Sequence, residues 1–517
     1  MKKILLYTFY LGLIFLNACT STQQLNTTGD DGKIDITLVQ INDVYEIAPL
    51  EGGKTGGMAR VATVKKDQLR ENPNTLLVIA GDFLSPSVYN SLKYNGTRIR
   101  GKQMVEAMNS AGVDLAVFGN HEFDISEADL QSRINESDFK WISSNTFNKK
   151  GNDIVPFVKQ KATGAEPFPE TYIMHAKDAD GTSAKIGFIG VTLPFNKAAY
   201  VSYTDVFEAA QKSYDHIKDS CDVVIAITHQ SLADDIKLAK QIPGLAMIIG
   251  GHEHERHYAR IGNVFITKAD ANAKSAYILK LKLNAVRHSF KVETKLVELN
   301  ESIAIDSATD VVVKKWTEIG DNNYASLGFD ARKVAMQTGQ PLDGREAYIR
   351  AVATNFTDLI VAAMEKASPT VDVSIINAGS IRVDDMLHMP VTQYDIIRSL
   401  PFGGSIMEVD IKGSLLIKLL NAGKKNWGTG GLLHYSSAAT NDSIGGNWAL
   451  KNINIDDNKV YKVAISDFLM TGGEANMGFL TKDNPDVVKV YPVYTDLKDP
   501  RSDIRRAIIN YMEGLGK

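Results

Sequence analysis

Short apolar runs rich in valine and isoleucine alternate with longer amphipathic stretches over the first part of the chain. The runs cover residues 34–41, 75–80, 115–118, 185–191, 223–228 and 245–249. Continuous apolar runs of this length are typical of strands that are buried on both faces of a sheet. The stretches with helical spacing are clearest at residues 58–70, 101–110 and 206–217. This alternation predicts an α/β domain over residues 33–300.

The remainder of the chain has a different pattern. Residues 301–344 contain a polar, helix-compatible stretch without candidate chemistry, and we interpret them as a connector. A second domain is expected over residues 345–517, because 517 residues are too many for one hydrophobic core. Its predicted elements are a helix at 348–367, a strand at 373–376, a helix at 412–421 and a strand at 460–465.

The amino terminus has the pattern of an export signal. Two lysines precede an apolar stretch at residues 4–16, which is too short to span a bilayer. The stretch ends in Leu-Asn-Ala-Cys, which resembles a bacterial lipobox whose cysteine, here Cys19, becomes the lipidated first residue of the mature protein. We interpret residues 1–19 as a lipoprotein signal peptide and residues 20–32 as a flexible tether. This predicts an exported protein of the cell envelope with a lipid anchor in a membrane; a plain signal peptide is the alternative.

Composition and charge exclude several classes of function. The apolar content of 44% and the charged content of 23% are ordinary for a soluble globular protein. The formal net charge is -4, whereas proteins that bind nucleic acids usually carry an excess of basic residues. No nucleic-acid partner is therefore expected. Besides Cys19 the chain has one other cysteine, Cys221, which rules out a disulfide framework. A small anionic ligand must therefore be held locally, by metal ions or by individual arginines.

Polar side chains follow five of the apolar runs. The carboxyl ends of strands in an open α/β sheet meet at one edge, where ligands bind. The residues that follow these runs include Asp43, Asp82, Asn120, His121, Glu122, Asp124, His229, His252, Glu253 and His254. Four of the ten histidines in the chain are among them. One histidine at a strand end is usually a hydrogen-bonded polar residue without a functional role. Chance is a poor explanation for carboxylates, an amide and imidazoles at five strand ends together.

This set of donors combines carboxylate and amide oxygens with imidazoles and contains no cysteine. It suits borderline divalent ions such as Zn or Mn better than calcium, and it does not match a structural zinc site. Two ions that share a carboxylate can position the attacking and leaving oxygens of an in-line displacement. The pattern therefore favours hydrolysis that depends on two divalent metal ions.

The motifs resemble those of the calcineurin-like metallophosphoesterases. The matching segments, in chain order, are Asp43, Gly81-Asp82, Gly119-Asn120-His121-Glu122, His229 and Gly251-His252-Glu253-His254. The Phe123-Asp124 extension and the second domain make the chain similar to the 5'-nucleotidase family over almost the whole mature sequence. The resemblance implies an α/β fold that consists of a four-layered metallophosphoesterase sandwich followed by an α+β nucleotide-binding domain.

The resemblance also implies roles for the strand-end residues. Asp82 would bridge the two metal ions. The remaining ligands would be Asp43 and His254 at the first site and Asn120, His229 and His252 at the second. His121 would act on the phosphoryl group as a catalytic residue, and Asp124 would orient its ring.

Three segments of the second domain resemble the nucleotide-binding half of the family. The implied substrate-binding residues are Asn377, Arg382, Phe402, Phe468 and Glu474. In the family two aromatic rings sandwich the base, and the two phenylalanines match those positions, with core packing as the alternative. Arg382 would bind the phosphate through its fork of donors. Glu474 stands where the family usually has aspartate, which puts the contact with the sugar in doubt.

The implied activity is metal-dependent release of phosphate from nucleoside 5'-monophosphates. One alternative is a phosphodiesterase or nucleotide-sugar hydrolase that uses the same site. Another is a catalytically impaired lipoprotein that binds nucleotides, and it rests only on Tyr45, which replaces the histidine of the family's Asp-x-His motif. We expect water at the vacated ligand position, and ligation by the phenol is the alternative.

The lipobox interpretation predicts the effect of changing Cys19. A Cys19→Ser variant is expected to move from the membrane fraction to the soluble fraction, because lipidation requires the thiol. Fractionation of cells that express either form measures this. A variant that stays with the membranes would show that Cys19 is not the anchor.

Overall fold

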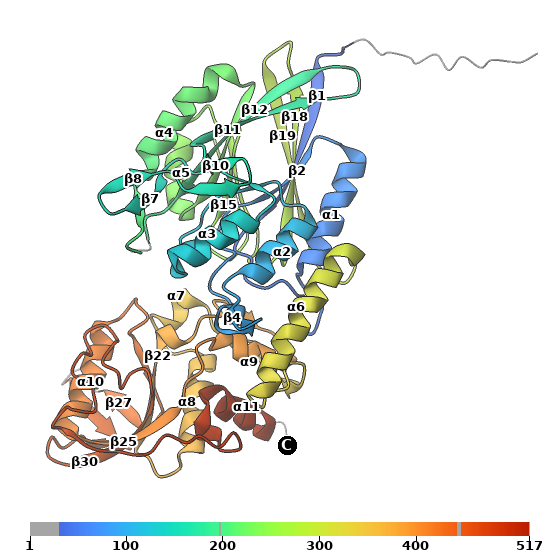
Figure 1. Cartoon of the computed structure of the whole chain (residues 1–517). Coiled ribbons are helices and arrows are strands. Elements are labelled where there is room, and N and C mark those ends of the chain that lie inside the picture. The colour runs from blue at the N-terminus through green and yellow to red at the C-terminus, as the bar shows by residue number, and fades with distance from the viewer. Residues whose placement is uncertain (1–29, 196–197, 442–445, 516–517) are drawn as a thin grey trace, which may run out of the picture.

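The structure is a computed structural model that describes residues 30–195, 198–441 and 446–515. Cys19, the predicted signal peptide and most of the predicted tether lie outside the described residues. The described part of the chain contains no helix that is long and apolar enough to cross a membrane. Two domains are visible in Figure 1, joined by the long helix α6 (Ser307–Ser326).

Two six-stranded sheets form the N-terminal domain. In spatial order the first contains β19 (Ser289–Glu298), β18 (Ser275–Asn284), β1 (Lys33–Ile41), β2 (Thr75–Ile79), β5 (Leu115–Ala116) and β6 (Lys140–Trp141). The second contains β11 (Thr171–Lys177), β12 (Ser183–Thr192), β14 (Val223–His229), β15 (Met247–Gly251), β17 (Val264–Lys268) and β16 (His257–Ile261). In the first sheet β1, β2, β5 and β6 run parallel to one another, and β18 runs antiparallel to β1. In the second sheet β12, β14, β15 and β17 run parallel.

The two sheets pack face to face, and helices cover their outer faces. Buried side chains such as Leu38 and Phe188 fill the space between the sheets. The helices α1 (Met58–Glu71) and α2 (Lys102–Ala111) lie over the first sheet, and α4 (Val206–Ile217) and α5 (Leu232–Gln241) lie over the second. This confirms the four-layered sandwich. The apolar runs predicted β1, β2, β5, β12, β14 and β15, but not the other six strands of the two sheets. In β16 and β19 exposed positions dilute the apolar signal.

The segment predicted as a connector divides between the two domains. Its helix α6 packs on α1 and α2, and the indole of Trp316 donates a hydrogen bond to Glu106 at 2.9 Å. Further along, β20 (Val334–Met336) pairs with β24 (Val391–Thr392), and β21 (Leu342–Asp343) pairs with β23 (Met386–Leu387). The end of the segment therefore belongs structurally to the C-terminal domain.

The C-terminal domain is built on a five-stranded mixed sheet. Its strands are β26 (Leu433–Tyr435), β22 (Val373–Asn377), β30 (Val460–Ser466), β25 (Ile406–Lys412) and β31 (Val487–Val490). Its principal helices are α8 (Asn355–Ala367), α9 (Gln393–Ser399), α10 (Gly413–Lys425) and α11 (Ile504–Leu515). The sheet and helices form the expected α+β arrangement (Figure 1).

The single helix predicted at residues 348–367 is wrong in its first part. A short helix, α7 (Glu346–Ile349), ends before α8 begins. The side chain of Thr354 accepts a hydrogen bond from the backbone N–H of Thr357, whose hydroxyl accepts one from the N–H of Thr354 at 2.8 Å. This capping box satisfies donors at the start of a new helix, and a threonine can close it in place of the usual Glu or Gln.

Candidate active site

The predicted metal ligands lie at the carboxyl ends of strands from both sheets. Asp43 and Asp82 follow β1 and β2 of the first sheet. His229 ends β14, and His252 follows β15, in the second. Ligand atoms of Asp43, Asp82 and His229 all lie within 4.8 Å of one another, and the three residues are buried. The packing of the two sheets therefore assembles residues that are far apart in the sequence.

The other predicted ligands surround this cluster. Asp82 Oδ2 is 3.1 Å from His229 Nε2, and Asp43 Oδ1 is 3.5 Å from His254 Nε2. The backbone N–H of His252 donates to Asp43 Oδ2 at 2.9 Å, and its ring lies 5.4 Å from that of His229, centroid to centroid. Asn120 is buried one residue before His121, whose N–H donates to Asp82 Oδ1 at 2.8 Å.

Four of the six predicted ligands have a left-handed backbone conformation. Their φ angles are 53° at Asp43, 54° at Asp82, 94° at His252 and 59° at His254. Such a conformation in a residue other than glycine costs on the order of 1 kcal/mol and persists only where its surroundings hold it. Because conformations of this kind cluster at functional sites, the backbone at these four positions agrees with the site that the motifs predict.

The arrangement of donors and acceptors fits a bound cation. His229 Nδ1 is 2.8 Å from the carbonyl oxygen of Ala80, which can only accept, so Nδ1 carries a proton and Nε2 is the nitrogen that faces Asp82. Burial lowers the pKa of His229, but Asp82 and Asp43 outweigh it and raise that pKa to about 9. A proton therefore occupies the position when no metal does. Asn120 Oδ1 is also buried without a hydrogen-bond partner among the described residues.

Two glutamates that were not assigned a role from the motifs hold the ligand loops. The Glu122 carboxylate is fully buried and accepts hydrogen bonds from backbone N–H groups in the loops after β2 and β5. The donors are the N–H groups of Asp82 (2.9 Å), Phe83 (2.7 Å), Leu84 (3.0 Å) and Gly119 (2.6 Å). Glu253, between the two histidines of its motif, accepts from the N–H of Leu232 and from the buried ammonium of Lys268. Their places inside the two motifs were the only sequence signal for these roles.

His121 and Asp124 lie together as the motif implied. His121 Nδ1 is 2.6 Å from Asp124 Oδ2, so the carboxylate fixes the orientation of the ring. Burial lowers the pKa of His121, but Asp82 and Asp124 outweigh this effect and raise it. The imidazole is therefore more readily cationic than a free histidine, which suits a group that stabilises developing negative charge or protonates a leaving oxygen.

Tyr45 points its hydroxyl into the first site. The oxygen is 2.9 Å from His254 Nε2, 3.2 Å from Asp82 Oδ2 and 3.4 Å from Asp43 Oδ1. Burial, followed by the charges of Asp82 and Asp43, raises the pKa of Tyr45 well above its usual value of 10. The phenol is therefore a neutral hydrogen-bond donor among all three predicted ligands of this site in the metal-free protein.

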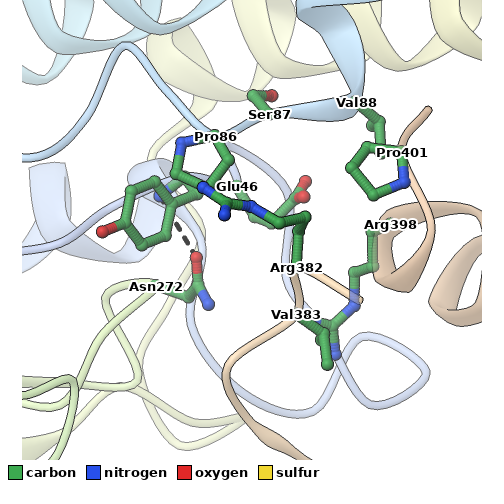
Figure 2. Close-up of a pocket in the computed structure, with 10 residues that line it drawn as sticks. Glu46, Pro86, Ser87, Val88, Asn272, Arg382, Val383, Arg398 and Pro401 are labelled. Atoms are coloured by element: carbon green, nitrogen blue, oxygen red, sulfur yellow. Dashed lines mark hydrogen bonds between the residues drawn. The ribbon is translucent and has the colours of Figure 1, made fainter. Parts of the chain in front are cut away.

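Among the predicted substrate-binding residues, Arg382 of the C-terminal domain lies beside this centre. It lines a cavity together with Tyr45, Glu46 and Asn272 of the N-terminal domain, and Figure 2 shows its side chain extending towards Pro86. Asn377 lies elsewhere in the domain, where its side-chain amide donates to Glu474 at 2.7 Å. The side chain of Glu474, which is one methylene longer than the aspartate usual in the family, thus contacts another predicted substrate-binding residue, Asn377.

The two phenylalanines proposed for the base are not core residues. Phe402 is 73% exposed and Phe468 is 45% exposed. Their loops are adjacent, because the N–H of Asp467 donates to the carbonyl of Ser405 at 3.1 Å and the N–H of Ser405 donates to Asp467 Oδ2 at 2.9 Å. The structure therefore places both rings on neighbouring loops, and it excludes core packing for them.

The fold and the site together define a metallophosphoesterase. Residues 36–256 match the family model of the calcineurin-like phosphoesterases, and residues 333–481 match that of the 5'-nucleotidase C-terminal domain. The 5'-nucleotidase of Bos taurus is 25% identical over 507 residues, which cover 85% of this chain and 83% of the relative. The 5'-nucleotidase of Homo sapiens is 24% identical over 510 residues, which cover 86% and 84%.

A solved structure shows the same fold over both domains. The 5'-nucleotidase precursor from Thermus thermophilus aligns with a TM-score of 0.65 at 21% identity, covering 93% of this chain and 97% of that chain. With both domain models matched in order, the chain belongs to the 5'-nucleotidase family. It is a metal-dependent phosphomonoester hydrolase.

The position of Tyr45 gives a prediction about metal binding. Tyr45→His is expected to strengthen binding of the more weakly held ion and to maintain or raise activity, because it supplies an imidazole ligand at the first site. Tyr45→Phe is expected to change the metal content little. Elemental analysis of dialysed protein measures both effects.

The two variants also distinguish ligation by the phenol. A sharp loss of metal in Tyr45→Phe contradicts the prediction, as does an absorption band from phenolate to iron in the unmodified protein. Either result makes Tyr45 a metal ligand.

Proposed function

We propose that the protein uses two divalent metal ions to hydrolyse nucleoside 5'-monophosphates to nucleoside and phosphate at the interface of its domains. The observation that carries the proposal is the buried cluster of Asp43, Asp82 and His229, whose possible ligand atoms lie within 4.8 Å of one another. Arg382 of the other domain lines the adjacent cavity and supplies the positive charge that a phosphate requires.

The ligands divide into two sites that share Asp82. Asp43 and His254 complete the first site, and Asn120, His229 and His252 complete the second. The mixture of oxygen and imidazole donors suits Zn or Mn. When bound, such ions lower the pKa of water and neutralise charge on the phosphoryl oxygens.

His121 is the proposed catalytic residue of the chain itself. With Nδ1 held by Asp124, its Nε2 is the nitrogen left to donate to a phosphoryl or leaving oxygen. The contact of Nδ1 with the Asp124 carboxylate favours the protonated imidazole that this role requires. Asp124 fixes the ring, and Arg382 holds the phosphate from the opposite domain.

The nucleoside is proposed to bind on the C-terminal domain. The exposed rings of Phe402 and Phe468 on neighbouring loops offer two apolar faces for a base, which is a mode of binding that tolerates different bases. Asn377 and Glu474 are joined by a hydrogen bond and offer polar atoms for the sugar.

We also propose that the reaction takes place outside the cytoplasm. The support is the pattern of the amino terminus, in which a basic start and an apolar stretch lead to Cys19. A lipid on this cysteine would anchor the protein to a membrane, with the enzyme facing the periplasm or the cell surface.

Phosphate release by the purified protein tests the reaction. With added Mn²⁺ or Zn²⁺ we expect turnover of AMP and loss of that turnover on chelation. A cyclic nucleotide and UDP-glucose should be poorer substrates. Turnover of either of these without turnover of AMP would favour a phosphodiesterase or a nucleotide-sugar hydrolase. Tight binding of nucleotide without metal-stimulated hydrolysis would instead identify an impaired nucleotide-binding protein.

His121→Ala tests the catalytic assignment. The variant should keep its metal content and lose activity by roughly 10²-fold to 10⁴-fold, the range for a positioned acid or charge-stabilising group. Elemental analysis and steady-state kinetics measure the two quantities. His175→Ala on the exposed side of β11 is the control for removal of a histidine. Loss of a metal ion from His121→Ala would make His121 a ligand and refute the assigned role.

A further inference from the structure

The predicted metal ligand His254 has a partner in the other domain. Its Nδ1 is 2.7 Å from Oδ2 of Asp384, which lies in the turn after β22 of the C-terminal domain. By comparison, Nδ1 of His229 donates a hydrogen bond to the carbonyl oxygen of Ala80, which belongs to the same domain as His229. The two histidines therefore have equivalent hydrogen bonds, but only that of His254 crosses the interface.

The partner determines which nitrogen of His254 is available to a metal. An ionised carboxylate only accepts hydrogen bonds, so Nδ1 carries the proton and Nε2 presents its lone pair on the side of Asp43, 3.5 Å away. A carboxylate on the second nitrogen of a ligating histidine fixes the orientation of the ring and increases its basicity as a ligand. Asp384 has the position and the chemistry for this role.

Asp384 is itself held in place. Its second oxygen accepts a hydrogen bond from the backbone N–H of Glu346 at the start of α7. Its φ angle of 39° is in the left-handed region, which Asp43, Asp82, His252 and His254 also occupy. A non-glycine residue adopts this conformation at a cost that its surroundings must offset. The carboxylate is therefore presented to His254 by an immobilised turn, two residues after Arg382.

We propose that Asp384 is a positioning residue that completes the first metal site from the C-terminal domain. The inference rests on the two-metal site proposed above. It makes the affinity of one ion depend on the docking of the second domain, because the domain that binds the nucleotide also orients a metal ligand. Arg382 would thus contact the phosphate, and Asp384, two residues later in the same segment, would orient a metal ligand.

Simple docking of the domains is the competing explanation, and the chain offers a matched control for it. The next residue, Asp385, forms an ion pair with Lys274 of the N-terminal domain at 2.6 Å. Lys274 is not among the predicted ligands. If Asp384 contributed only to docking, the loss of either carboxylate would have the same effect on metal binding.

Calorimetric titration of the full-length, metal-free protein with Mn²⁺ alone tests the proposal. We expect Asp384→Ala to weaken one of the two binding events by about 10-fold to 100-fold, the usual effect of losing such a partner, and to leave the other within about threefold. The isosteric Asp384→Asn should have a smaller effect of the same kind. Asp385→Asn should leave both events within about threefold of the unmodified protein. Circular dichroism and thermal melting establish that each variant is folded.

A double variant shows whether the effect of Asp384→Ala on the affinity for Mn²⁺ depends on His254. In a His254→Ala background, Asp384→Ala should cause no further loss of affinity for Mn²⁺. Unchanged binding in folded Asp384→Ala and Asp384→Asn overturns the inference, as does an equal loss in Asp385→Asn, or an undiminished loss in the His254→Ala background. Failure of the unmodified protein to bind two ions would instead refute the two-metal proposal.

Discussion

One buried carboxylate fixes the two loops on which the site depends. Glu122 accepts hydrogen bonds from the N–H groups of Asp82, Phe83, Leu84 and Gly119, so the loops after β2 and β5 form one unit. A buried N–H without a partner costs about 1–3 kcal/mol, so separating the loops would be expensive. Only glycine fits at position 119, because a Cβ there would collide with the carboxylate of Asp82. The position of the shared ligand therefore follows from backbone hydrogen bonds rather than from its own side chain.

A second constraint is electrostatic. The carboxylates of Asp43 and Asp82 and the imidazole of His229 come from two sheets and are buried together. Such a cluster is unfavourable unless a cation or a proton is present. The raised pKa of His229 and the neutral phenol of Tyr45 are two ways in which the metal-free protein accommodates this charge. A metal that binds only the folded chain would stabilise it by mass action.

The domain interface connects the chemistry of the two halves. The N-terminal domain carries the predicted metal ligands, whereas the C-terminal domain carries Arg382, the two exposed rings and the carboxylate of Asp384. Contacts outside the site hold the domains together, including the hydrogen bond from the hydroxyl of Tyr394 to Glu46 and the ion pair of Lys274 with Asp385. The proposed sites for substrate and metal therefore lie at a surface that neither domain forms alone.

The sequence by itself determined the fold class, six strands of the two N-terminal sheets and the set of candidate ligands. Apolar runs are local patterns, and the rule that ligands gather at the carboxyl ends of parallel strands turns them into a site. The other six strands of these sheets were missed; among them β16 and β19 have a weak apolar signal because many of their positions are exposed. The break before α8 was also missed, because its cap residues resemble ordinary helical residues. Only the tertiary structure decided where the Tyr45 hydroxyl lies, which N–H groups Glu122 accepts, and that Asp384 reaches His254. These contacts join segments that are distant in sequence, and their geometry depends on the packing of sheets and domains, which no local pattern encodes.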